Sequence, residues 1–348
     1  MNKTVKFFNP AKEYQLHRDE YLKAFDQVRS SGRLVGVNHQ EILEFEKAFA
    51  EYVGVRYAVG TNSGTDSLYI ALKAIGIKQE DEVILPSHTF VATAQVVAQL
   101  GATPILMDSF SKEELHEKVN ANTKAIIIAH IAGEITVDID LVKSFGLPII
   151  EDACQALGAT QNGKKAGSFG KVGAFSFYPA KILGGPGDGG ALVTDDEEIY
   201  KFAKEYRNHW KSDYSKWGIN SRLDVVLAKE LLIKLKRIDK TLARRQKIAE
   251  MYIDGLKDIK EITLPNNIPN RSWQDFIIRC VQGERDELYQ YLKANGIETM
   301  KNTYNFPIPK LPKSVEYEKS TLRLPCNEVL EDEEILYVIE KIKTFYEK

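Results

Sequence analysis

Short apolar segments alternate with helical patterns between about residues 55 and 195 of the chain. Segments such as AIIIAH and PIIED are apolar without alternation, which is typical of strands covered by helices on both faces. The segments between them, for example SGTDSLYIALKAIG and TFVATAQVVAQLG, carry apolar residues at helical spacing. The pattern therefore predicts an α/β fold whose mostly parallel central sheet is flanked by helices.

The second part of the chain has a different pattern. A helical pattern begins near Asp224 and continues toward Leu256, and we expect it to carry the chain out of the first domain. Beyond it, WQDFIIRCV is typical of a strand, while ERDELYQYLKANG and EDEEILYVIEKIKTFY are typical of helices. We therefore predict a large domain over residues 1–240, including a helical N-terminal segment, and a smaller C-terminal α+β domain over residues 241–348. The first 55 residues are largely helical and could pack on either domain.

Composition excludes several classes of protein. With 47 basic and 49 acidic side chains the net charge is −2, so nothing marks a surface that binds nucleic acid. The three cysteines are widely spaced and show neither a disulfide framework nor a metal-binding pattern. No apolar stretch reaches membrane-spanning length, and the first residues lack the apolar core of a signal peptide. We therefore expect a cytoplasmic protein with no nucleic-acid or membrane partner and no metal.

Candidate chemistry is expected where strands end, because ligands of open α/β sheets collect at the carboxyl ends of the strands. After VRYAVGT, the residues NSGTD open a helix. The free amides and positive dipole of a helix start attract anions, and the hydroxyls of Ser63 and Thr65 are further donors. Taken alone, an ordinary N-cap is the commoner explanation of this turn.

Two other strand ends carry an aromatic residue and a carboxylate. Phe90 follows the DEVILP strand, where it could belong to the core or offer a flat face to a ring. Asp152 follows LPII, where it could cap the next helix or serve a ligand. The histidines His88, His130 and His209 form no HxxxH or HExxH pair, so we interpret them as structural.

The sharpest feature is the lysine in SFYPAKILGGPGDGG. This glycine-rich loop matches neither GxxxxGK[ST] nor GxGxxG. Most loop lysines are solvated, but a partly desolvated amine is a nucleophile that can form a Schiff base. An anion site at Ser63–Thr65, a flat ring at Phe90, a carboxylate at Asp152 and an amine at Lys181 together match pyridoxal 5′-phosphate. Lys181 would then hold the aldehyde, and Asp152 would keep the ring nitrogen protonated.

Five motifs extend this interpretation: GTNSGTDSL, PSHTFVATA, IIEDACQALGA, GAFSFYPAK and GINSRLD, in this order. With them the chain resembles the DegT/DnrJ/EryC1/StrS group of sugar aminotransferases, which are fold type I enzymes dependent on pyridoxal phosphate. The resemblance covers nearly the whole chain. It implies that Gly64 and Thr65 bind the cofactor phosphate with Ser63 beside them, and that Ser176 donates to the same phosphate.

The resemblance also implies the contacts of the cofactor ring. Phe90 would stack on the pyridine ring, Asp152 would pair with its nitrogen, and Gln155 would lie near the 3-hydroxyl. Lys181 would form the covalent link and, once freed, act as the general base. Asn220 would reach the cofactor phosphate of the neighbouring subunit, so the resemblance implies a homodimer with shared active sites.

The implied reaction moves an amino group from an amino acid, by resemblance L-glutamate, to a keto-sugar nucleotide in deoxyaminosugar biosynthesis. Tyr-Pro before Lys181 and Gly-Asp-Gly-Gly after it are similar to members that act at C3, and the alternative is a C4-specific enzyme. A non-catalytic regulator with the same fold is a further alternative. Relatives that are dehydratases carry histidine in place of the lysine. The segments IAGE and TYNFPIPKLPKSVEYEK depart from the family pattern, which leaves the sugar open.

Overall fold

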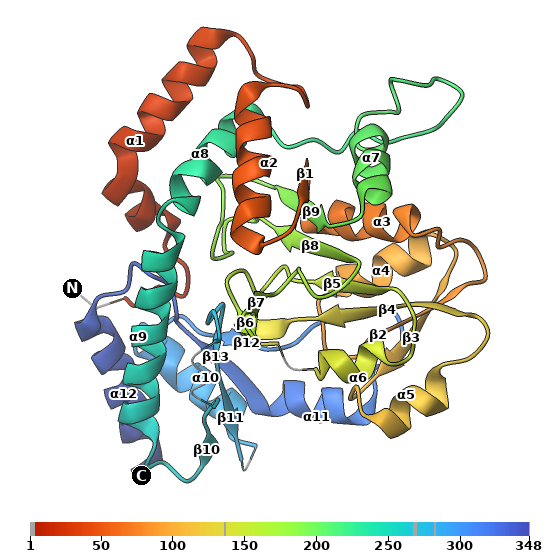
Figure 1. The fold of residues 1–348 in the computed structure, drawn as a ribbon. Coiled ribbons are helices and arrows are strands. Elements are labelled where there is room, and N and C mark those ends of the chain that lie inside the picture. Colours follow the sequence, from red (N-terminus) through yellow and green to blue (C-terminus); the bar gives the residue numbers. More distant parts are fainter. Residues whose placement is uncertain (1–3, 136, 267–269, 282, 348) are drawn as a thin grey trace.

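The computed structural model describes residues 4–135, 137–266, 270–281 and 283–347, which form two units, each built on one sheet (Figure 1). The larger sheet has seven strands in the order β1-β9-β8-β5-β4-β2-β3. These strands are β1 Tyr57–Thr61, β2 Glu82–Pro86, β3 Thr103–Met107, β4 Thr123–Ala129, β5 Ile149–Asp152, β8 Val172–Ser176 and β9 Gly190–Thr194. Strand β9 is antiparallel to both its neighbours, and the other pairs are parallel. The predicted mostly parallel sheet is confirmed.

Helices cover both faces of this sheet. One face carries α3 Gly64–Ala74, α4 Val91–Gln99 and α7 Glu197–Tyr206, and the other carries α2 Gln40–Val53, α5 Lys112–Lys118, α6 Ile139–Lys143 and α8 Val225–Leu235. Strand β4 shows why its sequence is apolar throughout. Ile126 and Ile128 pack into the core on the α5–α6 side, whereas Ala125 and Ile127 pack on the α3–α4 side, and all four are fully buried.

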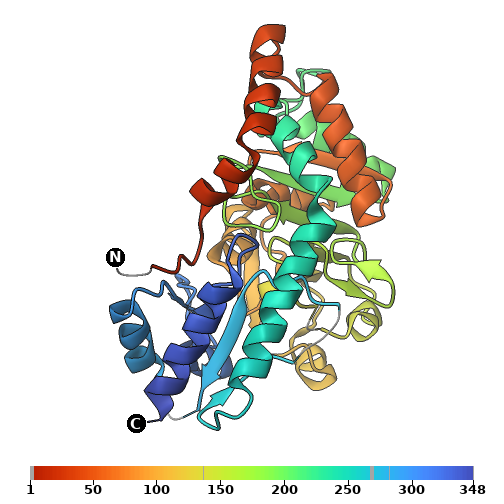
Figure 2. The same ribbon diagram turned by 90° about the vertical axis from the view of Figure 1, so that its left-hand side faces the viewer.

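The chain between the two units is two helices, where the sequence pattern predicted one. Helix α8 ends at Leu235, and α9 (Ile238–Leu256) begins after a turn. The prediction is wrong at this turn because Arg237 has non-helical backbone angles (φ −106°, ψ 1°) while its guanidinium donates to Tyr21 Oη of α1 (Pro10–Ser31). Contacts with a segment distant in sequence therefore set the break. Figure 2 shows α9 running from the large sheet to the smaller unit.

The smaller unit is an antiparallel sheet in the order β10-β11-β13-β12, packed against helices. Its elements are β10 Ile262–Thr263, β11 Phe276–Cys280, β12 Met300–Lys301, β13 Thr321–Leu324, α10 Arg285–Ala294, α11 Pro312–Ser320 and α12 Asp332–Tyr346. Val5, at the other end of the chain, pairs with Ile297 and lies in this unit's core. The predicted domain division after residue 240 falls within α9 and stays a prediction. Among the described residues, no helix is both long and apolar enough to span a bilayer.

Candidate active site

The turn between β1 and α3 is a helix start with unpaired amides. Ser63 is the N-cap, and its Oγ accepts from the Asp66 amide at 3.1 Å, so the N-cap explanation of this residue is correct. The first helical bond runs from the Ser67 amide to the Ser63 carbonyl. The amides of Gly64 and Thr65 come before that bond and have no helical carbonyl to reach. The cap and an anion site are therefore compatible in one turn.

Glycines let three strand ends meet at this turn. A Cβ on Gly64 would lie 2.7 Å from Cys154 Sγ and 2.9 Å from Ser176 Cβ, and a Cβ on Gly190 would lie 2.3 Å from the Ser63 carbonyl carbon. At these distances a Cβ atom would overlap its neighbours, so neither position 64 nor position 190 has room for a side chain. The close approach explains why glycine follows the lysine loop: Gly190 packs against backbone at the start of α3.

Asp152 lies buried at the end of β5, held by neutral donors. Its Oδ2 accepts from Thr93 Oγ1 at 2.7 Å, and its Oδ1 accepts from the Cys154 amide at 3.3 Å. The chain after β5 makes turns, so the proposal that Asp152 caps a following helix is wrong. Within the described residues Asp152 has no ion pair, and its charge stays available to a cationic ligand atom.

Phe90 and Gln155 both contact Tyr304. Phe90 is 53% exposed at the start of α4, so the proposal that it belongs to the core is wrong. Its ring meets that of Tyr304 edge to face, with centroids 6.3 Å apart. Gln155 Nε2 donates to Tyr304 Oη at 3.1 Å, and Gln155 Oε1 accepts from the Ala132 amide at 3.1 Å. Burial raises the pKa of Tyr304, so its hydroxyl stays protonated at neutral pH.

Lys181 follows β8 on a half-buried turn, with its amide donating to the Tyr178 carbonyl at 2.8 Å. The charges of Lys181 and Asp152 both act on one thiol, that of Cys154. Burial raises the pKa of Cys154 well above its usual range, Asp152 raises this pKa further, and Lys181 opposes the shift. The fold therefore brings Lys181 and Asp152 within electrostatic reach of one side chain, Cys154, which itself contacts Gly64.

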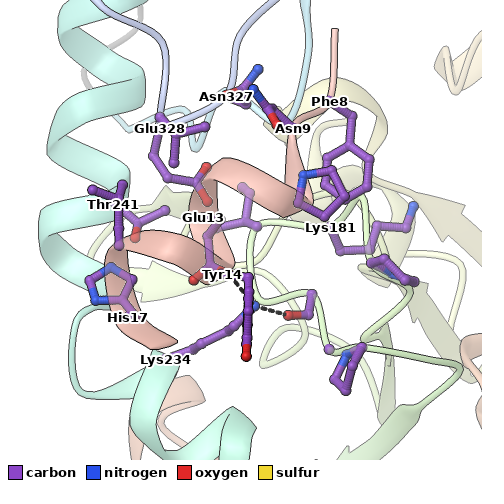
Figure 3. Close-up of a pocket in the computed structure, with 18 of the residues that line it drawn as sticks. Phe8, Asn9, Glu13, Tyr14, His17, Lys181, Lys234, Thr241, Asn327 and Glu328 are labelled. Atoms are coloured by element: carbon purple, nitrogen blue, oxygen red, sulfur yellow. Dashed lines mark hydrogen bonds and ion pairs between the residues drawn. The ribbon is translucent and has the colours of Figure 1, made fainter. Parts of the chain in front are cut away.

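A cavity of about 550 Å³ opens beside the lysine loop, between α1, α8 and α9 (Figure 3). Of the predicted site residues, only Lys181 lines it. Lys234 spans this cavity: its Nζ donates to the Gly184 carbonyl at 2.8 Å and lies 3.2 Å from Glu13. In Figure 3 the Lys181 amine points away from the side chains of Lys234 and Glu13.

Two further predicted residues lie beside the α3 turn. Ser176 ends β8, and its Oγ accepts from the Tyr178 amide at 3.3 Å. Asn220 is exposed, but its neighbour Ser221 is tied to the turn. Ser221 Oγ accepts from the Asn62 amide at 3.0 Å and donates to Asp66 at 2.7 Å.

The histidines that end two strands have structural partners. His130 Nε2 lies 2.9 Å from Glu151 Oε2, and both side chains are fully buried. His88 Nδ1 lies 3.0 Å from Glu318, which also accepts from Lys310. Burial opposes ionisation of Glu318, but the hydrogen bonds from His88 and Lys310 outweigh it and lower the pKa of this carboxyl. No group of three or more His, Cys, Asp or Glu side chains in the described part of the chain is placed to hold a metal ion.

Sequence reasoning missed two residues of the site. Thr93 orients Asp152 and also bonds to Thr89, with 2.9 Å between the hydroxyls. It lies one turn after Phe90 on α4, so the i, i+3 spacing in TFVAT was a signal. Tyr304 comes from the segment TYNFPIPK. This segment has neither helical nor strand periodicity, so the sequence does not indicate that Tyr304 lies in the site.

The arrangement fits pyridoxal 5′-phosphate. Free amides and small side chains at the α3 turn suit a phosphate, the exposed face of Phe90 suits a flat ring, and Asp152 suits a protonated ring nitrogen. The fold and the site together indicate a protein of the class that uses this cofactor.

Comparison with known proteins names the family. The sequence profile of the DegT/DnrJ/EryC1/StrS aminotransferase family matches residues 15–343, and the chain belongs to this family. It is 34% identical to a dTDP-3-amino-3,4,6-trideoxy-alpha-D-glucose transaminase of Streptomyces venezuelae, over 99% of this chain and 97% of that protein. It is 32% identical to a pleiotropic regulatory protein of Geobacillus stearothermophilus, over 98% of both chains.

Solved structures agree with this assignment. The crystal structure of DesV from S. venezuelae superposes with a TM-score of 0.92 and 34% identity, over 99% of both chains. NtdA from Bacillus subtilis, solved with bound cofactor PMP, superposes with a TM-score of 0.90 and 25% identity, over 99% of this chain and 86% of that one. The predictions of an aminotransferase and of pyridoxal phosphate as its cofactor are confirmed.

The contact between Gly190 and Ser63 is testable by substitution. We expect Gly190→Ala to weaken cofactor binding at least roughly tenfold and to lower the free energy of unfolding by about 1–3 kcal/mol, because the new methyl displaces the α3 turn. Fluorescence titration with pyridoxal phosphate and denaturant unfolding measure the two effects.

The matched control is Gly187→Ala in the same loop, where a Cβ meets nothing within 4 Å. This variant should retain wild-type binding and stability. Equal losses in both variants would show that loop glycines matter for chain flexibility and not for the contact with Ser63.

Proposed function

We propose that the protein transfers an amino group from L-glutamate to the C3 keto group of a sugar nucleotide. The observation that carries this proposal is the grouping of Lys181, Asp152 and the α3 turn around Cys154, on a chain of a sugar-aminotransferase family. Bound at this site, pyridoxal phosphate would supply an aldehyde for amine exchange and an electron-withdrawing ring.

The chain's own groups divide the work. Gly64 and Thr65 would bind the phosphate through their amides, with Ser63 and Ser176 beside them. Asp152 would hold a proton on the ring nitrogen, and the Thr93 hydroxyl bond would keep the carboxylate oriented. This arrangement uses a buried anion whose counter-charge comes with the ligand.

Three groups would act nearer the reacting atoms. Phe90 would cover one face of the ring, and Gln155, held by Ala132 and Tyr304, would donate near its 3-hydroxyl. The Lys181 amine, once released, would take the proton from the donor's α-carbon. It would then deliver this proton to the carbon that carried the cofactor's aldehyde.

Two observations support C3 as the position of amination. The chain carries Tyr178-Pro179 before the lysine and Gly-Asp-Gly-Gly after it, residues that resemble those of family members acting at C3. The S. venezuelae relative at 34% identity is named for a 3-amino sugar. A regulator without catalysis is disfavoured because Lys181 and Asp152 are both present.

The role of Lys181 is tested by reductive trapping. After incubation with pyridoxal phosphate and borohydride, the wild-type peptide containing residue 181 should gain the mass of the reduced cofactor. Lys181→Ala should gain none, and its amination rate should fall at least roughly a thousandfold because the general base is lost. Lys112→Ala removes an exposed lysine on α5 and serves as the control. An adduct of equal yield on Lys181→Ala would place the reactive amine elsewhere.

The acceptor is tested with a panel of 3-keto and 4-keto sugar nucleotides and L-glutamate as donor. We expect amination of 3-keto compounds, detected by mass spectrometry, and none in the Lys181→Ala control. Amination of 4-keto compounds alone would contradict the C3 assignment. Transfer from another amino acid at a higher kcat/KM than from L-glutamate would contradict the donor.

We also propose that two copies of the chain share their active sites in the cytoplasm. Asn220 follows a loop whose two large aromatic side chains, Tyr214 and Trp217, are 87% and 92% exposed, as expected of residues that a second copy covers. In this arrangement Asn220 of one copy would contact the cofactor phosphate of the other. The tie of Ser221 to Asp66 supports the opposite arrangement, in which Asn220 serves its own chain.

Mixing two inactive variants separates these arrangements. If sites are shared, Lys181→Ala and Asn220→Ala chains refolded together form dimers with one complete site, and activity recovers to about a quarter of wild type. If Asn220 serves its own chain, each mixed dimer has two defective sites and activity stays at the level of the separate variants. Size-exclusion chromatography of each sample verifies that dimers are present.

A further inference from the structure

The backbone around Lys181 is held by a side chain from the smaller unit. Gln274 lies just before β11, and its amide makes two bonds to the lysine loop. Its Nε2 donates to the Ala180 carbonyl at 2.9 Å, and its Oε1 accepts from the Ile182 amide at 3.1 Å. One planar group thus binds the peptide groups immediately before and after the lysine.

Ile182 and Leu183 anchor this loop in the core, but few hydrogen bonds hold its backbone beside the lysine. Glycine occupies positions 184, 185, 187, 189 and 190, and glycine leaves the backbone many conformations. Backbone bonds within the loop run from the Lys181 amide to the Tyr178 carbonyl, from the Gly185 amide to the Phe177 carbonyl and from the Phe177 amide to the Gly189 carbonyl, and Lys234 donates to the Gly184 carbonyl. None of these bonds involves the Ala180 carbonyl or the Ile182 amide, which are the two groups that Gln274 satisfies.

Gln274 itself stands on a rigid base. The buried guanidinium of Arg245 donates to the carbonyls of Trp273 (3.2 Å), Gln274 (3.3 Å) and Cys326 (2.6 Å). Trp273 is fully buried, and its indole donates to Gln246 Oε1 at 2.6 Å. A side chain on such a base holds its partner in place more firmly than a side chain on a mobile loop.

Strained and tightly packed backbone supports the same segment. Trp273 has φ +53°, in the left-handed region that a non-glycine residue adopts at a cost. Gly133 lies so close that a Cβ there would be 2.5 Å from the Trp273 amide nitrogen and 2.8 Å from that of Gln274. The Ser272 amide also donates to the Gly133 carbonyl at 2.9 Å. The segment is therefore locked between the two units.

We propose that Gln274 is a positioning residue for Lys181. Gln274 holds the peptide groups on both sides of the lysine, so that the amine stays close to the reacting atoms after it leaves the cofactor. The inference rests on the proposed function of Lys181. During each half-reaction the lysine is covalently free, and the position of its backbone then sets which points the amine can reach. A misplacement of about 1 Å can reduce a rate a hundredfold.

The first test replaces the amide by an apolar side chain of similar size. In Gln274→Leu, hydrogen exchange of the peptide covering residues 177–186 should become at least tenfold faster, with or without cofactor. In the loaded enzyme kcat should fall roughly tenfold to a hundredfold, with the KM for L-glutamate changed less than about threefold, because the amine is misplaced while donor-binding groups are intact.

The matched control is Gln246→Leu, which removes the bond from Trp273 in the same segment without touching the lysine loop. Exchange of residues 177–186 and kcat should stay within about twofold of wild type in this variant. Equal effects in the two variants would overturn the proposal, since Gln274 would then act only through packing of the segment. Unchanged exchange and kcat in Gln274→Leu would overturn it as well.

A second variant gives a signature that a purely structural role would not produce and keeps the test decisive if Gln274→Leu does not fold. In Gln274→Glu, a protonated carboxyl can donate to the Ala180 carbonyl and accept from the Ile182 amide, whereas a carboxylate repels the carbonyl. The ratio of its kcat to that of wild type should therefore rise as pH falls and the carboxyl gains its proton. A ratio independent of pH would contradict the clamp.

The two proposals fail in different ways. If the role of Lys181 is wrong, borohydride trapping finds no adduct at residue 181 in the wild type. If only the clamp is wrong, trapping succeeds while loop exchange in Gln274→Leu matches that of wild type.

Discussion

The peptide between Ser63 and Gly64 is enclosed by backbone and small side chains from three strand ends. Gly190 lies against its Ser63 side, while Cys154 and Ser176 lie against Gly64, at distances that admit no additional carbon atom. This contact sets where the start of α3 stands relative to the ends of β5 and β8. The amides at that start, the carboxylate on β5 and the lysine after β8 make up the proposed site, and their relative positions depend on this contact.

Two neighbouring carboxylates on β5 illustrate how the fold assigns different tasks to similar groups. Glu151 is fully buried and accepts from His130 and from the amides of Gly167, Phe169 and Gly170, so its charge is used within the chain. Asp152 points to the opposite face of the sheet and accepts only from a hydroxyl and one amide in the described part of the chain. Its remaining capacity suits a protonated ring nitrogen, and alternation along one strand separates the two roles.

The smaller unit contributes to the site by fixing the lysine loop. Helix α9 connects the units, Val5 returns the N-terminal segment to the smaller one, and Gln274 reaches from it to both sides of Lys181. The glycines that let the loop pass close to α3 and α8 also make it pliable. An external clamp is a physical solution to that conflict between close packing and precise placement.

The sequence by itself determined the alternating elements, the mostly parallel sheet and the strand ends at which Ser63, Phe90, Asp152 and Lys181 lie. Apolar periodicity is a local property, and the carboxyl ends of parallel strands share one edge whatever their order. Only the tertiary structure decided that α8 and α9 are separate helices, that Phe90 is exposed and that no helix follows Asp152. It also supplied Thr93, Tyr304 and Gln274, whose partners lie 59, 149 and 92 positions away. Such bonds depend on which strands become neighbours, and β1 beside β9 shows that spatial order does not follow chain order.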